Sequence, residues 1–209
     1  MKDSKINIKK MLLALSGIFL IGIGVALNSC AQLGNDPIGI VYDGVRNIAK
    51  LNSEQLGTAS NLVNYGLILL LIFTGRRYVN IGTLIYILPY GFFVNLGARL
   101  YHNIFTNSSI PLQWMTVVTG CLLLYTGVAI FIAVDIGLDP FTGVVMVIRD
   151  KIKWDYKKTK VIFDVIMVVI GTALGGKLGI ITFATALTAG PMIQFISNRF
   201  KVLIAERNG

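Results

Sequence analysis

Charged side chains are scarce in this chain of 209 residues. They make up 14% of the sequence, against about 25% in soluble domains, while 55% of the residues are hydrophobic. This composition excludes a soluble enzyme and a disordered regulator, because both keep a larger share of charged surface. Long apolar runs fill the chain instead, and they predict an integral membrane protein whose principal partner is the lipid bilayer.

Metal-ligating residues are also few. His102 is the single histidine, and neither it nor the two cysteines, Cys30 and Cys121, has a second ligand at metal-binding spacing. We expect no metal and no cofactor, two thiols without a function, and His102 as a residue at a helix end. The sequence contains no Ser-His-Asp set and no pair of carboxylates within one apolar segment, so we do not expect an enzyme.

Acidic residues are outnumbered by basic ones, 10 against 19, which leaves a net charge of +9. No basic helix or aromatic RNA-binding motif accompanies this excess, so we expect no nucleic-acid partner. The basic residues cluster between apolar runs, as the positive-inside rule describes. We therefore expect a bacterial inner-membrane protein with both termini in the cytoplasm, including a basic N-terminus over residues 1–10.

Six apolar runs approach the roughly 20 residues that a membrane-spanning helix needs. They cover residues 11–31, 57–74, 79–101, 112–134, 160–175 and 178–198. The first follows lysines as a signal peptide would, but we expect it to be retained because a counterpart recurs later in the chain. Most tyrosines, among them Tyr42, Tyr86 and Tyr90, are assigned to the interfacial aromatic belt.

The sequence repeats itself, with matching residues 103 positions apart, as in Gly24 and Gly127. Two segments at matched positions, 37–51 and 140–153, are too short and too polar at their C-terminal ends to be comfortable spans. The predicted fold is an all-α polytopic membrane protein of two homologous halves, each with three spans and one short helix. The halves cover residues 11–105 and 112–205, joined by the linker 106–111.

Three spans per half is an odd number, so the second half would enter the membrane inverted, as in many transporters. The alternative is eight spans, in which the short segments cross and the halves are parallel. The distribution of lysine and arginine does not distinguish the two arrangements, and both place the termini inside. The length of the short segments favours six spans.

A Gly-x-Asp-Pro turn precedes each short segment. Aspartate directly before proline suits the N-cap of a helix, so we expect Asp36 and Asp139 to cap the short helices. If the two turns enter the membrane from opposite faces, two helix N-termini meet near the midplane and form a polar site there. The predicted solute site consists of Gly34, Asp36, Asn61, Asn64, Asn95, Gly137, Asp139, Asp164 and Gln194.

Asp164 allows two interpretations. It lies one helical turn after Lys160, so the two side chains can form an ion pair near the interface. Alternatively, Asp164 faces a cavity and binds a proton or a cation. Its partner in the first half, Asn61, is also polar, which favours an inward-facing position for both.

The segments GNDPIGIVYDGVRN and GLDPFTGVVMVIRDK, each followed by a helix with a polar residue, resemble the YczE/YyaS/YitT group of bacterial membrane proteins. The resemblance implies a multi-pass plasma-membrane protein without an agreed biochemical function. We expect a transporter or permease for an unknown small solute, bound between the halves. The alternatives are a substrate-binding membrane subunit of a larger importer and a non-transporting accessory protein. Assembly as a homo-oligomer or with importer subunits is compatible with either.

Overall fold

The computed structural model describes residues 8–105 and 109–206, and in these ranges the chain forms helices and turns without a strand. Most of the predicted basic N-terminus and the first half of the predicted linker lie outside the described residues. The helices are α1 (Ile8–Ala31), α2 (Pro37–Ile48), α3 (Leu56–Thr74), α4 (Ile81–Ile104), α5 (Ile110–Val134), α6 (Pro140–Ile152), α7 (Tyr156–Ala173) and α8 (Ile180–Glu206), with 3₁₀ turns η1 (Ser53–Gln55) and η2 (Arg76–Tyr78).

Five of these elements are long and apolar enough to cross a membrane: α1, α3 together with η1, α4, α5 and α8. This confirms the prediction of an all-α polytopic membrane protein. The sixth predicted run, 160–175, overlaps α7 and extends two residues past its end. That helix has 18 residues and carries three lysines and Asp164 in its first half, so it falls outside the group of five.

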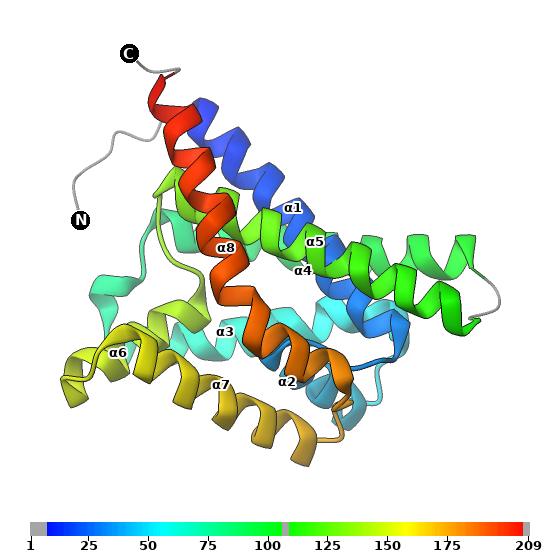
Figure 1. Ribbon diagram of the computed structural model, residues 1–209. Coiled ribbons are helices and arrows are strands. Elements are labelled where there is room, and N and C mark those ends of the chain that lie inside the picture. Colours follow the sequence, from blue (N-terminus) through cyan, green and yellow to red (C-terminus); the bar gives the residue numbers. More distant parts are fainter. Residues whose placement is uncertain (1–7, 106–108, 207–209) are drawn as a thin grey trace.

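The two short segments form helices of 12 and 13 residues, α2 and α6. Such helices are only about 18–20 Å long, well below the ~30 Å of hydrocarbon in a bilayer. The middle of α2 meets the start of α6, since the ring centroids of Tyr42 and Phe141 are 5.8 Å apart. From there they diverge: α2 leads to η1 at the start of α3, whereas α6 runs to η2 at its end (Figure 1).

Glycines bring α1 and α5 into close contact at the centre of the molecule. A Cβ atom on Gly17 would lie 2.9 Å from the carbonyl oxygen of Gly127, and one on Gly24 would lie 2.6 Å from that of Gly120. Small residues commonly allow such backbone approach between membrane helices. The partner number falls as the α1 number rises, so the two helices are antiparallel.

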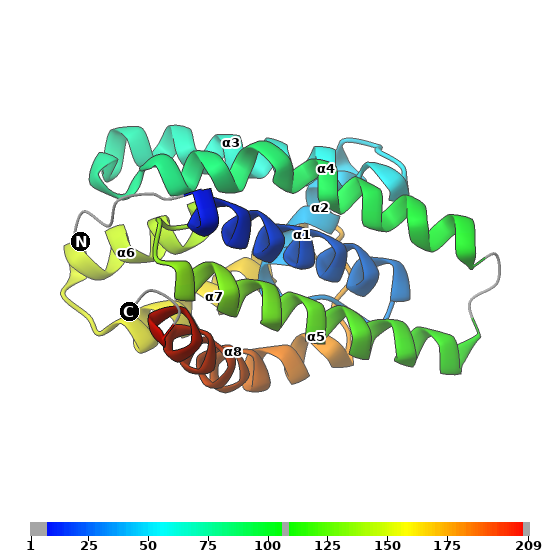
Figure 2. The same cartoon turned by 90° about the horizontal axis from the view of Figure 1, so that it is seen from above.

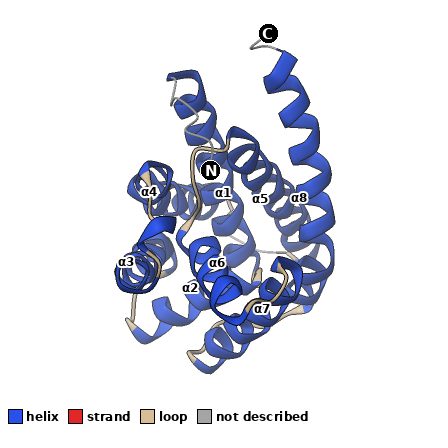
Figure 3. Ribbon diagram, turned by 90° about the vertical axis from the view of Figure 1, so that its left-hand side faces the viewer, coloured by secondary structure: helices blue, strands red, loops and turns tan. Residues whose placement is uncertain are grey.

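Four of the five long helices form a layer, and the other helices pack on one side of it. Figure 2 shows α4, α1, α5 and α8 next to one another in that order, and the contacts between these helices agree. On the remaining face α2 packs against α7, and α3 packs against α6. The arrangement is uneven at its edges, because α3 packs on α4 whereas α8 rests chiefly on α5 and not on α7 (Figure 3).

Candidate functional site

The two turns cap the short helices as predicted. Asp36 Oδ2 accepts a hydrogen bond from the Ile38 amide at 3.2 Å, and Asp139 Oδ1 accepts one from the Thr142 amide at 3.0 Å. Each capping carboxylate satisfies an amide that has no partner within the helix. The other oxygen of Asp36, Oδ1, is buried and has no hydrogen-bond partner among the described residues.

The turn glycines touch neighbouring backbone. Gly34 has φ +101°, and a Cβ atom there would lie 2.7 Å from the Cα atom of Gly179 at the start of α8. A Cβ atom on Gly137 would lie 2.1 Å from Asn80 Oδ1 at the start of α4. The Leu138 carbonyl nearby accepts a hydrogen bond from Thr83 Oγ1 at 2.8 Å. Gly34 and Gly137 therefore fix the two turns against α8 and α4.

The space between the starts of the short helices is filled by three tyrosines. Tyr42, Tyr86 and Tyr90 are between 1% and 7% exposed, so their assignment to the interfacial belt is wrong. The centroid of the Tyr90 ring lies 4.9 Å from that of Tyr86 and 6.0 Å from that of Tyr42. Asn64 joins this tyrosine cluster by donating from Nδ2 to Tyr42 Oη at 3.2 Å. The centre of the molecule is thus packed with aromatic rings.

The other predicted site residues lie apart from the tyrosine cluster. Asn95 Oδ1 accepts a hydrogen bond from the Gly57 amide at 2.7 Å, and Asn61 packs against Gly91, so both serve the α3–α4 interface. Asp164 forms the predicted ion pair with Lys160, and both side chains remain partly exposed. Gln194 lies on an exposed face of α8. The nine predicted residues therefore do not surround one common cavity.

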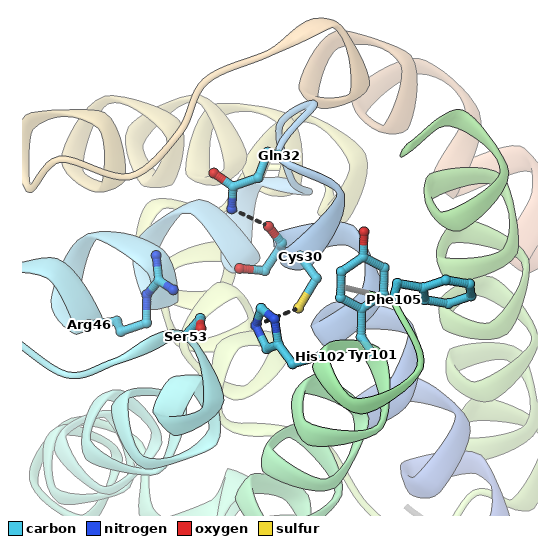
Figure 4. A pocket seen from close by; sticks show the side chains of 8 residues that line it. Cys30, Gln32, Arg46, Ser53, Tyr101, His102 and Phe105 are labelled. Carbon is cyan, nitrogen blue, oxygen red and sulfur yellow. Dashed lines mark hydrogen bonds between the residues drawn. The ribbon is translucent and has the colours of Figure 1, made fainter. Parts of the chain in front are cut away.

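A cavity of about 310 Å³ lies instead where α1, α2 and α4 end, beside η1. It is lined by Ser29, Cys30, Gln32, Arg46, Ser53, Tyr101, His102 and Phe105, which we call the Arg46 pocket (Figure 4). Cys30 Sγ lies 4.0 Å from His102 Nε2. His102 is in the last turn of α4, as predicted, and it also faces this pocket.

A buried carboxylate, that of Asp43, lies next to Arg46 at the Arg46 pocket. Asp43 is 4% exposed and accepts hydrogen bonds from Ser29 Oγ at 2.5 Å and Asn35 Nδ2 at 3.4 Å. Arg46 Nη2 lies 3.6 Å from Asp43 Oδ1, so the two charges compensate each other. The Arg46 Nε atom is buried and has no hydrogen-bond partner among the described residues. An N–H group in that position can donate to a ligand.

A second cavity, of about 340 Å³, lies at the other end of α3. Asp150 lies at its edge and accepts hydrogen bonds from Tyr78, Arg77 and Arg149. The hydrogen bond from Tyr78, followed by that from Arg149, lowers the pKa of Asp150 to about 2. This cavity is bordered by basic side chains and lies on the same side as the start of α7.

The described helices, five of them able to span a bilayer, define the class of a polytopic helical membrane protein. The chain belongs to a family of unknown function, DUF6198, whose profile matches residues 8–198. It is also similar to an uncharacterised protein of Haemophilus influenzae. The two are 22% identical over 190 residues, which cover 91% of this chain and 84% of that protein. No solved structure matches the chain.

Proposed function

We propose that this protein is a small-solute transporter of the bacterial inner membrane, built from two inverted halves. The observation that carries the proposal is the pair of short helices, α2 and α6, which meet in the middle, where Tyr42 lies against Phe141, and run to opposite ends of α3. Irregular backbone at membrane depth is tolerated where protein buries it or where it lines a cavity, and broken helices of this kind are common in transporters.

The glycine contacts support an inverted repeat. Adding 103 to Gly17 gives Gly120, and subtracting 103 from Gly127 gives Gly24, so the two α1–α5 contacts are images of each other. The two equivalent helices run antiparallel, which is the relation expected for inverted halves. Parallel halves would place equivalent helices in the same direction.

The turns support the same symmetry. Gly34 lies against Gly179 and Gly137 lies against Asn80, and these are matched contacts at offsets of 103 and 99 residues. In each case a turn of one half is held by the beginning of the last helix of the other half. Exchange of this kind ties the two halves into one unit.

We assign α7 as the sixth span. Its valines 161, 165 and 169 are 56–63% exposed along one face, as suits a surface against lipid, and its 18 residues reach about 27 Å. Six spans agree with the position of the start of α1 and the end of α8 at the same end of the molecule (Figure 1). With six spans, most lysines and arginines fall at that end, and Arg46, Lys50, Arg99 and Lys177 are the exceptions, which favours a cytoplasmic location for both termini.

The two cavities, at opposite ends of α3, suit the two entrances of a transporter whose centre is closed. The tyrosine cluster and the capped starts of α2 and α6 lie between them and form the barrier that must open. Asp36, with its unpartnered carboxylate oxygen, and Asp139 are then the polar groups that a solute meets at the barrier. The relation to the YczE/YyaS/YitT group remains part of this proposal.

The tight packing of the same centre favours a second candidate function, a non-transporting accessory protein. Such a protein needs no passage, so Tyr86 and Tyr90 would stay buried throughout. The third alternative, a membrane subunit of a larger importer, would use the face of α8 that is exposed among the described residues.

Cysteine labelling distinguishes the first two functions without knowledge of the solute. In a background with Cys30→Ser and Cys121→Ala, a Tyr86→Cys variant is exposed to a membrane-impermeant thiol reagent in right-side-out and in inside-out vesicles. A transporter is expected to be labelled slowly from both sides, because its centre opens alternately. Ala98→Cys, which replaces a fully buried residue between helices, is the control that stays unlabelled. If the Tyr86→Cys variant is labelled from neither side, the result contradicts transport.

A further inference from the structure

We propose that the Arg46 pocket binds a small organic carboxylate. The pocket brings side chains from the end of α1, from α2, from η1 and from the last turn of α4 around one space (Figure 4). Its volume of about 310 Å³ is at the lower end of the ~300–1,000 Å³ usual for ligand sites. That is room for about ten water molecules at about 30 Å³ each.

Arg46 supplies the positive charge. Its side chain is 13% exposed, and its buried Nε–H has no acceptor within residues 8–105 and 109–206. A buried donor without a partner is costly, and a carboxylate oxygen of a ligand would remove that cost. Asp43 does not fully occupy the guanidinium, because this carboxylate already accepts from Ser29 and Asn35 and stands 3.6 Å from Arg46 Nη2.

The described residues that line the pocket include no carboxylate that would repel the ligand. The nearest acidic side chain in sequence, Glu54, is directed to Arg99, 3.8 Å away. Further donors surround the space: the hydroxyl of Ser53, the imidazole of His102 and the amide of Gln32. Gln32 is itself held by Lys177, which donates to its carbonyl oxygen, and this adds a second cation next to the pocket.

Aromatic side chains form the rest of the wall. Tyr101 is buried, and its ring centroid lies 5.2 Å from that of Phe105. An inorganic ion would leave this apolar side of the pocket without a contact. A carboxylate attached to a compact apolar body fills both sides, so an organic anion fits the pocket better than phosphate does.

The pocket lies where α1, α2 and α4 end, which is the end of the bundle opposite the start of α1 and the end of α8 (Figure 1). Under the orientation proposed above, this is the outer face of the membrane. Binding itself does not depend on transport. Only the further statement that the carboxylate is the transported solute rests on the proposed function.

Equilibrium binding of benzoate to the purified full-length protein in lipid nanodiscs tests the proposal, with neutral benzamide and inorganic phosphate as comparison ligands. Benzoate is expected to bind, benzamide to bind at least tenfold more weakly, and phosphate to compete poorly. Equal binding of benzoate and benzamide would overturn the role of charge. Equal competition by phosphate would overturn the organic class.

Variants locate the site. Arg46→Gln is expected to weaken benzoate binding at least tenfold, whereas Arg149→Gln, at the matched position of the second half, leaves it unchanged. Because Arg46→Gln also leaves Asp43 without its cation and can misfold, a second pair avoids the buried charges. Ser53→Glu places a carboxylate in the pocket and is expected to abolish binding, while Ser53→Gln, of the same size but neutral, retains it. Unchanged benzoate binding in Ser53→Glu would overturn the assignment.

The outcome separates this proposal from the proposed function. Binding of benzoate by a protein whose Tyr86→Cys variant stays unlabelled identifies an anion-binding protein without transport. Labelling of Tyr86→Cys without binding of benzoate would contradict the proposed carboxylate site in the Arg46 pocket. It would leave the proposed transport function intact.

Discussion

Gly24 and Gly120 hold α1 and α5 at a distance that leaves no room for a side chain, since a Cβ atom on Gly24 would lie 2.6 Å from the carbonyl oxygen of Gly120. Backbone cannot yield as a flexible side chain does, so the helices must move apart to admit even a methyl group. The whole layer of long helices depends on this contact, because α4 packs on α1 and α8 packs on α5.

The first prediction is that Gly24→Val lowers the free energy of unfolding by about 1–3 kcal/mol or more. Thermal unfolding of the detergent-solubilised protein, followed by size-exclusion chromatography, measures the change. Gly66→Val is the matched control, because a Cβ atom on Gly66 meets nothing within 4 Å and should leave the midpoint of unfolding nearly unchanged. Equal midpoints for the two variants would contradict the importance of the α1–α5 contact.

The second prediction concerns the helix caps. Asp139→Ala removes the acceptor for the Thr142 amide and should cost about 0.5–2 kcal/mol of stability, whereas Asp139→Asn, an equally good cap, should cost little. Asp36→Ala should behave in the same way. If Asp139 also meets the solute, the asparagine variant loses transport while it keeps its stability. Full stability and full activity in both alanine variants would remove these aspartates from the site.

The third prediction is a dependence of stability on pH. The pKa of Asp150 in the folded protein is about 2, below its ordinary value of 3.8, because the side chain accepts hydrogen bonds from Tyr78 and Arg149. Because its pKa is lowered in the folded protein, the ionised Asp150 stabilises the folded state at any pH above its ordinary pKa. This contribution is lost as the pH falls from about 4 to about 2. Unfolding midpoints measured between pH 5 and pH 2 should decline less steeply in Asp150→Asn than in the unchanged protein. Parallel curves would mean that Asp150 has no part in the decline.

The fourth prediction concerns topology. Asn52 and Arg76 are exposed and lie at opposite ends of α3. With six spans and cytoplasmic termini, a cysteine at Asn52 is labelled from outside the cell and one at Arg76 only from the cytoplasm. The eight-span alternative predicts the reverse assignment. A cysteine at Lys157, at the start of α7, serves as the cytoplasmic reference.

Local spacing in the sequence predicts much of the fold. The Asp-Pro pairs place the starts of α2 and α6 at Pro37 and Pro140, and the four-residue spacing of Lys160 and Asp164 yields the ion pair that the structure contains. These features depend on neighbours within one or two helical turns, so the local sequence contains the necessary information.

The Arg46 pocket could not be predicted in the same way. Its residues come from three separate stretches, and the sequence offers Cys30 and His102 only as isolated residues 72 positions apart. The prediction that the tyrosines of the cluster lie in the interfacial aromatic belt is wrong for a related reason. Position within an apolar run gives the approximate depth of Tyr86 or Tyr90, but the face that each presents depends on which helices pack together. The sequence around Asp43 and Arg46 has no apolar periodicity that would predict a buried ion pair there.

The helices α4 and α8 differ in how closely other helices pack around them, and this difference affects how the protein can move. α4 packs on α1 and on α3, whereas α8 packs chiefly on α5. Displacing a helix costs less when fewer neighbours must be released, so α8 is easier to displace than α4. Any rearrangement of this protein that displaces one of these two helices should therefore begin with a tilt of α8 and involve α4 only afterwards.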